Sequence, residues 1–215
     1  MTRRLTQLLV GLVMYGVSLA LVLRAGLGLA PWDVLHQGLA QRTGATVGQM
    51  VIAVSFVVLL AWIPLRQRPG LGTVANVLVI GAATDATLAL THTPDDLLVR
   101  LALTLVGGVL LNGLAGAMYI GAQLGPGPRD GLMTGISRRT GLSLRLVRTV
   151  QEVLVVVVGF GLGGSVGLGT VVYAVSIGPI VHYLLPKLIV PLDVELPRQR
   201  SGRTTQAGSL AAQQI

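Results

Sequence analysis

Two aspartates, Asp33 and Asp130, are the strongest candidates for binding chemistry, because they lie in one motif that the chain repeats 97 positions apart. The first copy reads Gly-Leu-Ala-Pro-Trp-Asp-Val-Leu-His-Gln-Gly-Leu, and the second reads Gly-Pro-Gly-Pro-Arg-Asp-Gly-Leu-Met-Thr-Gly. A proline two positions earlier is typical of the first turn of a helix. A carboxylate in that turn either caps the helix or binds a ligand or proton near the positive end of the helix dipole.

Further polar residues join this candidate site through their places in the repeat or in apolar segments. Trp32 and Arg129 precede the two aspartates: tryptophan is typical of a membrane interface, and arginine suits an anionic lipid or ligand. Glu152 follows Arg148 by four positions, so we expect these two side chains to pair. The candidate ligand or proton-binding residues are Asp33, Asp130, Trp32, Arg129, His36, Gln37, Thr134, Asn112, Tyr15 and Glu152.

Patterns that mark catalytic or metal sites are missing from the sequence. There is no Gly-x-Ser-x-Gly, no His-Glu-x-x-His and no phosphate-binding loop with its lysine. The chain has no cysteine, and His36, His92 and His182 stand far apart. We therefore expect no enzyme, no metal site and no cofactor.

The repeated motif belongs to a duplication that covers most of the chain. The same displacement, without a gap, relates Gly11 and Gly16 to Gly108 and Gly113. It also relates the run Gly-Leu-Gly-Thr-Val at 70–74 to the identical run at 167–171. Such self-similarity predicts two repeats, over residues 1–97 and 98–192, followed by a polar, disordered tail over residues 193–215.

The composition is that of a membrane protein. Only 11% of the residues are charged, against about a quarter in soluble domains, and the mean hydropathy is +0.76. The net charge of +8 does not predict a nucleic-acid partner, because the basic residues lie in short segments between apolar runs. Six of those runs are long enough to span a bilayer: Leu5–Leu23, Val47–Leu65, Gly72–Leu90, Leu101–Gly121, Leu146–Leu162 and Leu168–Leu185.

The distribution of arginine predicts the orientation of these spans, since cytoplasmic loops collect Lys and Arg. With both termini in the cytoplasm, the outer segments hold only Arg24, Arg42 and Arg100. Three spans per repeat would turn the second repeat upside down, so we expect an all-α polytopic membrane protein built as a 3+3 inverted repeat. The cytoplasmic segments then hold Arg3, Arg4, Arg66, Arg68, Arg129, Arg138, Arg139, Arg145, Arg148, Lys187, Arg198, Arg200 and Arg203.

Each repeat also contains a short helix made by the motif itself. In the first repeat it begins near Pro31 and ends at Gly44, with Asp33, Gln37 and Gln41 on one face. A helix of this length covers about half of the hydrocarbon layer. It either lies flat at the interface as an amphipathic helix or enters the protein as a re-entrant half-helix.

The paired motifs, with Arg-Arg-Thr-Gly after the second, resemble those of the YczE/YitT-like family of bacterial integral membrane proteins. The similarity runs from about Thr6 to Pro191. The resemblance implies a multi-pass protein of the bacterial inner membrane, and it implies little about molecular activity.

Two functions remain open at this level. The architecture favours a small secondary transporter or exporter with its ligand site where the repeats meet. The alternative is a membrane protein that interacts with or regulates another system without moving a substrate. The lipid bilayer is the expected partner, and a small-molecule substrate and a homo-oligomer are both compatible with the sequence.

We predict that reporter proteins fused after Asp95 and after Ser165 will lie outside the membrane, and that fusions after Arg68 and after Leu192 will lie inside. The reason is the concentration of arginine in the loops assigned to the cytoplasm. Alkaline phosphatase and fluorescent-protein activities measure the two locations. A C-terminus on the outside would contradict the inverted repeat.

Overall fold

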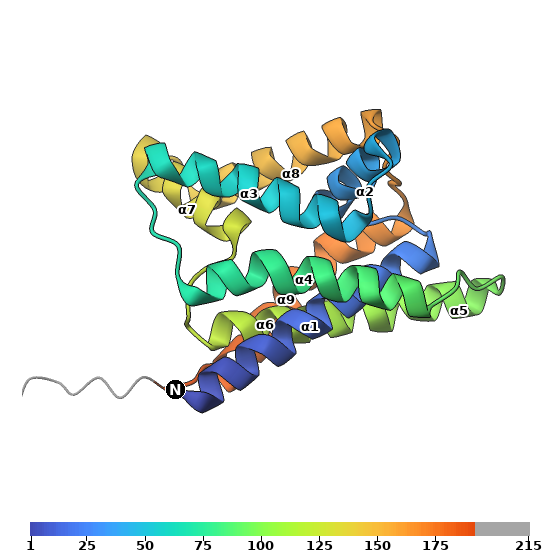
Figure 1. Cartoon of the computed structure of the whole chain (residues 1–215), viewed down its shortest axis with the longest axis horizontal. Coiled ribbons are helices and arrows are strands. Elements are labelled where there is room, and N and C mark those ends of the chain that lie inside the picture. The colour runs from blue at the N-terminus through green and yellow to red at the C-terminus, as the bar shows by residue number, and fades with distance from the viewer. Residues whose placement is uncertain (192–215) are drawn as a thin grey trace, which may run out of the picture.

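The computed structural model describes residues 1–191, and the predicted disordered tail at 193–215 lies outside the described residues. Every regular element within residues 1–191 is a helix (Figure 1). The elements are α1 (Thr2–Ala25), α2 (Pro31–Thr43), α3 (Val47–Leu65), α4 (Leu71–Leu90), α5 (Leu97–Ala102), the π-helix η1 (Leu103–Leu111), α6 (Asn112–Gly121), α7 (Pro128–Thr140), α8 (Leu144–Gly161) and α9 (Leu168–Leu188).

The two motif helices begin and end as the sequence predicts. Pro31 and Pro128 stand in the first turns of α2 and α7. Both helices end at a glycine in the left-handed conformation, Gly44 with φ 72° and Gly141 with φ 73°. Glycine adopts this conformation without the steric cost that a Cβ atom brings.

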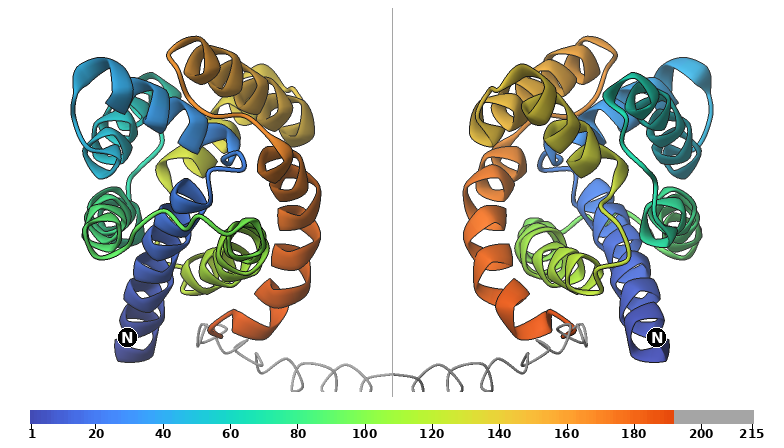
Figure 2. Two further views of the ribbon diagram at one scale, coloured as in Figure 1. Left: turned by 90° about the vertical axis from the view of Figure 1, so that its right-hand side faces the viewer. Right: turned by 90° about the vertical axis from the view of Figure 1, so that its left-hand side faces the viewer.

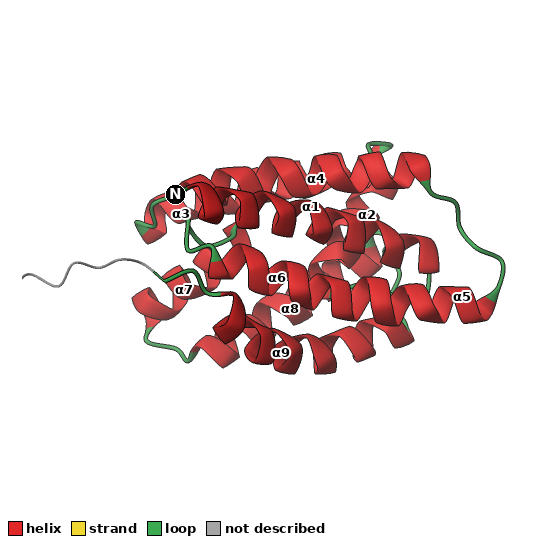
Figure 3. Ribbon diagram, turned by 90° about the horizontal axis from the view of Figure 1, so that it is seen from below, coloured by secondary structure: helices red, strands yellow, loops and turns green. Residues whose placement is uncertain are grey.

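The helices form two groups around the interior. Helix α1 packs between α4 and α6, and α6 packs against α9, which together make one layer (Figure 3). Figure 2, viewed along the long axis of Figure 1, shows α4 and α6 on either side of α1. Helices α2, α3, α7 and α8 lie over this layer (Figure 1). The core between α1, α3, α4 and α6 contains Leu8, Leu12, Tyr15, Leu19, Val51, Ile80, Ala115, Tyr119 and Ala122.

A helix occupies each of the six apolar segments. Five of the described helical stretches are long and apolar enough to cross a membrane, with η1 and its neighbours counted as the single stretch Leu97–Gly121. The exception is α8, whose 18 residues include Arg145, Arg148 and Glu152. Large apolar side chains such as Phe56 and Phe160 are exposed on the outer faces, as expected for helices that face lipid. The chain is therefore a multi-pass membrane protein, and the sixth crossing stays a prediction.

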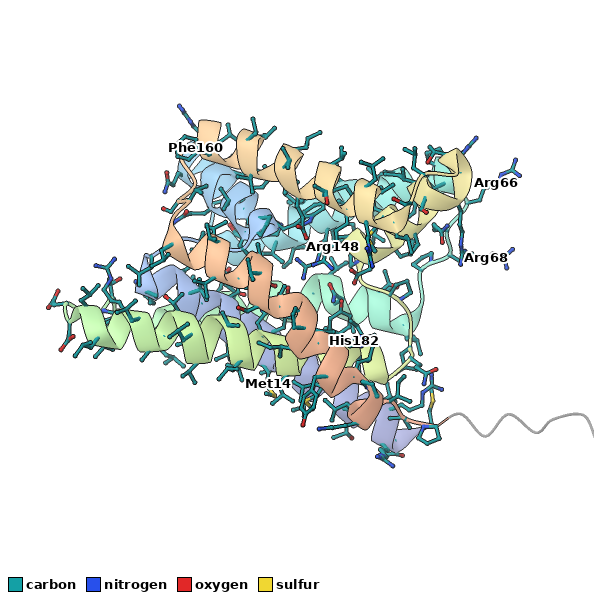
Figure 4. The ribbon with its side chains drawn as sticks, turned by 180° about the vertical axis from the view of Figure 1, so that it is seen from behind. Met14, Arg66, Arg68, Arg148, Phe160 and His182 are labelled. Atoms are coloured by element: carbon teal, nitrogen blue, oxygen red, sulfur yellow. The ribbon has the colours of Figure 1, made fainter. Side chains whose placement is uncertain are left out.

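Positive charge gathers at one end of the molecule. Arg66 and Arg68, after α3, lie at the end opposite Phe160 of α8 (Figure 4). The N-terminus lies at the same end as the α3–α4 connection (Figure 1). The segments that the sequence assigns to one side of the membrane are thus grouped in space.

The two halves of the chain are joined by a reciprocal pair of backbone hydrogen bonds. The Gly72 N–H, at the start of α4, donates to the Leu124 carbonyl at 2.8 Å, and the Gly169 N–H, at the start of α9, donates to the Leu27 carbonyl at 2.8 Å. These bonds are equivalent under the 97-residue displacement. Each satisfies an N–H group that the first turn of a helix leaves free.

The displacement also relates the unusual backbone conformations. Every described residue with positive φ has its counterpart 97 positions away, also with positive φ. The pairs are Gly26 and Gln123, Gly28 and Gly125, Gly44 and Gly141, and Arg66 and Gly163.

The short helices pack across the halves: α2 lies on α8, and α7 lies on α3. Both contacts depend on a glycine. An added Cβ at Gly159 of α8 would lie 2.5 Å from the Leu35 backbone nitrogen, and one at Gly131 of α7 would lie 2.0 Å from the Trp62 ring. Gly159 is the counterpart of Trp62. In the first half the tryptophan packs against a glycine of α7, and in the second half the glycine packs against the backbone of α2.

We predict that Gly159→Ala lowers the thermal unfolding temperature of the detergent-solubilised protein. The added methyl group meets backbone atoms that cannot rotate away, and such overpacking costs about 1–3 kcal/mol. Gly161→Ala, two residues along the same helix, is the control, because nothing lies within 4 Å of its added Cβ. Equal unfolding temperatures for the two variants would contradict the close approach of α2 to α8.

Candidate functional site

A cavity of about 330 Å³ lies between α1, α6, α7, α8 and α9, beside the first turn of α2. We call it the large cavity. Figure 4 shows two of its lining residues, Arg148 on α8 and His182 on α9. Its polar lining consists of Tyr15, Trp32, Asn112, Tyr119, Arg129, Asp130, Arg148, Gln151, Glu152, Tyr173 and His182.

Arg129 is the central cation of the large cavity. Its Nη2 donates a hydrogen bond to the Tyr15 hydroxyl, and its guanidinium carbon lies 5.4 Å from the centroid of the Tyr15 ring. The ion pairs found within residues 1–191 are Asp33 with His36 and Arg148 with Glu152, so Arg129 has no carboxylate partner there. Its other N–H groups have no protein acceptor among the described residues.

Tyrosine hydroxyls hold the neighbouring polar groups in place. The Tyr119 hydroxyl donates to Oδ2 of Asp130 at 2.6 Å, and the Tyr173 hydroxyl donates to Oδ1 of Asn112 at 2.9 Å. The second bond joins α9 to α6, so Asn112 takes part in a contact between helices as well as lining the cavity. The Tyr15 and Tyr119 rings meet edge to face, with 6.3 Å between centroids. The network therefore connects α1, α6, α7 and α9.

Helix α8 supplies the remaining charged wall. Nε of Arg148 lies 2.9 Å from Oε1 of Glu152, which confirms the pairing expected from their spacing. These side chains are 53% and 31% exposed, so neighbouring protein atoms cover the pair only in part. Nε2 of Gln151 is buried and has no hydrogen-bond partner within residues 1–191. A buried amide without a partner is costly, which makes it a candidate for contact with a ligand or water.

A second, smaller cavity of about 50 Å³ lies between α1, α2, α3 and α4, and we call it the small cavity. Asp33 and His36 line it and are both buried. Nδ1 of His36 lies 3.3 Å from Oδ1 of Asp33. Tyr15, Trp32 and Arg129 line both cavities, so these residues form the boundary between them.

The two cavities are counterparts. All but one of the residues that line the small cavity have their partner, 97 positions away, in the lining of the large one. The polar wall of α8 in the large cavity corresponds to a largely apolar wall of α3 in the small one. The small-cavity residues Val51, Val54, Ser55, Asp33, Trp32 and Tyr15 correspond to Arg148, Gln151, Glu152, Asp130, Arg129 and Asn112.

Helix spacing explains the difference in volume. Helices α3 and α4 pack along each other, whereas their counterparts α8 and α9 make few contacts. The large cavity therefore lies beside an opening between α8 and α9, where His182 and Gly178 are exposed.

The structure thus brings most of the candidate residues together. Gln37 and Thr134 lie elsewhere: Gln37 accepts from the Ser165 N–H at 2.6 Å, and Thr134 donates to the Gly131 carbonyl at 3.1 Å. Neither Asp33 nor Asp130 accepts a hydrogen bond from a backbone N–H of the described residues, so neither caps its helix in that way. Both still lie in the first turn, near the positive end of the helix dipole. No three His, Asp or Glu side chains in the described part of the chain group as metal ligands. The set of candidates omits Tyr119, Arg148, Gln151, Tyr173 and His182, which also line the large cavity.

Some of these omissions had a signal in the sequence. Tyr119 and Tyr173 are polar residues in apolar spans, and Gln151 is next to Glu152. Nothing in the sequence marked His182 as a cavity residue, since a single histidine near the end of a span has many structural roles.

Comparisons with known proteins give a family without an assigned activity. A family of unknown function, DUF6198, matches residues 2–186. An uncharacterized protein of Haemophilus influenzae is 43% identical over 178 residues, which cover 83% of this chain and 81% of that protein. The uncharacterized membrane protein YczE of Bacillus subtilis is 34% identical over 191 residues, or 86% of each chain. These matches confirm the resemblance to YczE, and no solved structure matches.

We predict that Tyr119→Phe lowers the unfolding temperature of the purified protein, because Asp130 loses the hydroxyl that donates to it. A hydrogen bond to a charged group contributes about 1.5–3 kcal/mol. Tyr183→Phe is the matched control: that ring is exposed, and its contact with Lys187 involves the ring face. A Tyr119→Phe variant as stable as the control would show that the Tyr119–Asp130 bond contributes nothing.

Proposed function

We propose that this chain, which belongs to the DUF6198 family of unknown function, is a small secondary transporter or exporter with its ligand site in the large cavity. The observation that carries the proposal is the correspondence of the two cavities, residue by residue, under the 97-residue displacement. A transporter built from repeats needs two such positions, because its halves exchange conformations as the site opens to alternate sides.

The proposal requires that the repeats be inverted, with a pseudo-twofold axis in the plane of the membrane. Each half has three long helices. They are α1, α3 and α4 in the first half, and the α5–α6 stretch, α8 and α9 in the second. If all six cross the bilayer, the second half is inverted relative to the first. The matched pairs of positive φ and the reciprocal bonds of Gly72 and Gly169 support a twofold relation between the halves, and the odd number of long helices in each half is what would place its axis in the membrane plane. Asp33 would then lie toward the outside and Asp130 toward the cytoplasm.

The motif helices would be re-entrant half-helices in this arrangement. The first turn of α2 is buried among the longer helices, with Pro31, Asp33 and Val34 inside, while Gln41, Arg42 and Thr43 at its other end are exposed. A helix lying flat at the interface would instead expose one face along its whole length. Irregular backbone such as Gly26–Ala30 is tolerated at membrane depth when protein surrounds it.

Transport would occur when the packing of α3 with α4 and the packing of α8 with α9 exchange. In the present state α8 and α9 make few contacts and the large cavity has a volume of about 330 Å³, while α3 and α4 are packed and the small cavity has only about 50 Å³. In the opposite state α8 would close on α9, and α3 would separate from α4. Arg129 would face the ligand in both states, because it lines both cavities.

We predict that single cysteines in the two cavities will react with a charged, membrane-impermeant maleimide from opposite sides of the membrane. The native chain has no cysteine, so Val181→Cys for the large cavity and Val54→Cys for the small one need no prior substitutions. Labelling is measured in right-side-out and in inverted vesicles. Exchange between two states makes both positions reactive, each from its own side.

Phe56→Cys is the control, because that side chain is exposed on α3 where lipid would exclude a charged reagent. If Val181→Cys reacts and Val54→Cys reacts from neither side, the protein holds one state. That outcome would favour the alternative function, a membrane protein that regulates another system without transport.

A further inference from the structure

We propose that the large cavity binds a small zwitterion, with the ligand's anionic group on Arg129 and its ammonium group on Asp130. This inference rests on the proposed function, since it names the substrate class of the same site. The two residues are consecutive in the first turn of α7, and neither is paired with the other or with another charged side chain of residues 1–191.

Arg129 is arranged to receive an anion. Contact with the Tyr15 ring and hydroxyl orients the guanidinium, and that hydroxyl is its one hydrogen-bond partner among the described residues. A guanidinium has five N–H donors in a planar fork that fits a carboxylate or a phosphate through two parallel bonds. The positive end of the α7 dipole adds to the attraction.

Asp130 is arranged to receive a cation. Its Oδ2 accepts from Tyr119, and its Oδ1 has no donor among the described side chains. A carboxylate fixed by one hydroxyl keeps acceptor capacity for an ammonium group. The buried, unpartnered Nε2 of Gln151 lies in the same lining and offers a further donor to the ligand's anionic end.

Charge balance favours a zwitterion over a simple anion or cation. Arg148 and Glu152 already neutralise each other. A monoanion on Arg129 would leave Asp130 uncompensated, and a monocation on Asp130 would leave Arg129 uncompensated. An uncompensated charge away from water is costly, whereas a zwitterion compensates both groups at once.

The small cavity supplies an internal comparison. There Trp32 replaces Arg129, and His36 is the hydrogen-bonding partner of Asp33. The first half therefore supplies no free pair of opposite charges of its own, and the guanidinium that also lines the small cavity, Arg129, comes from the second half.

Two sources of such a ligand fit the position of the cavity. A soluble amino acid has a carboxylate and an ammonium group one carbon apart, and a phosphoethanolamine headgroup has a phosphate and an ammonium group. The opening between α8 and α9 would admit a headgroup from the membrane as well as a soluble molecule. The chemistry recognised by Arg129 and Asp130 is the same.

The test measures the unfolding temperature of the full chain in detergent with matched sets of compounds. The first set is alanine, propionate and ethylamine; the second is leucine, 4-methylpentanoate and isopentylamine; the third is glycerophosphoethanolamine, glycerophosphoglycerol (a phosphodiester with a single negative charge) and ethanolamine. A ligand that binds the folded protein raises the unfolding temperature. We expect a zwitterion from at least one set to do so, with affinity at least about tenfold above its two singly charged analogues, because each analogue loses a charge-assisted contact.

Variants assign the two ends of the ligand. Arg129→Gln should abolish the preference for the zwitterion over the amine, and Asp130→Asn should abolish its preference over the anion. If Arg129→Gln does not fold, Arg129→Lys replaces it in the same measurement, because lysine keeps the positive charge and loses the planar fork of donors. Arg138→Gln, exposed on the same helix, is the control and should bind as the native protein does.

The outcomes separate this inference from the proposed function. Equal binding of an anion and its zwitterion, or no response to any set, overturns the inference and leaves the cysteine-labelling test of transport intact. Zwitterion binding together with labelling of Val181→Cys alone supports the inference and rejects transport. If only the zwitterion of the third set stabilises the protein, the ligand is a lipid headgroup. If only zwitterions of the first two sets do so, the ligand is an amino acid.

Discussion

The reciprocal hydrogen bonds between the halves are the constraint on which the arrangement of the interior depends. The segment before α2 lies against the start of α9, where Gly169 donates to the Leu27 carbonyl. The segment before α7 lies against the start of α4, where Gly72 donates to the Leu124 carbonyl. The approach is so close that a Cβ at Gly28 would lie 2.6 Å from the Gly167 nitrogen. Gly28 also has φ 113°, a conformation that side chains disfavour. These contacts place the first turns of α2 and α7 inside the protein, and the site residues with them.

Within this shared frame, the two halves differ in chemistry. Equivalent positions hold Arg148, Gln151 and Glu152 in α8 but Val51, Val54 and Ser55 in α3. Helix α8 is the one long helix of the described chain that is not among the candidate membrane spans, and it has three charged residues, Arg145, Arg148 and Glu152. Two of these three, Arg148 and Glu152, line the large cavity.

A buried arginine is costly unless it is hydrated or paired. Here the Tyr15 hydroxyl and ring contact Arg129, and the cavity leaves its remaining donors accessible. Asp130 is held in a similar way by Tyr119. Tyrosine suits both tasks, because its ring packs against apolar helices while its hydroxyl bonds to a charged group. The network orients two opposite charges without neutralising either.

The sequence by itself determined the membrane-protein class, the motif helices with their proline starts and glycine ends, and the pairing of Arg148 with Glu152. These features follow from local spacing or from the 97-residue repeat, both of which are readable along one chain. Asp85 shows what is not readable: it accepts from the Gly48 N–H at 2.8 Å and so serves the start of α3, which lies far from it in the chain. Likewise, only the tertiary structure decided that the two motif sites differ in volume, about 330 Å³ at Asp130 and about 50 Å³ at Asp33. Cavity volume depends on how far apart α8 and α9 lie, and that separation results from packing among several helices at once.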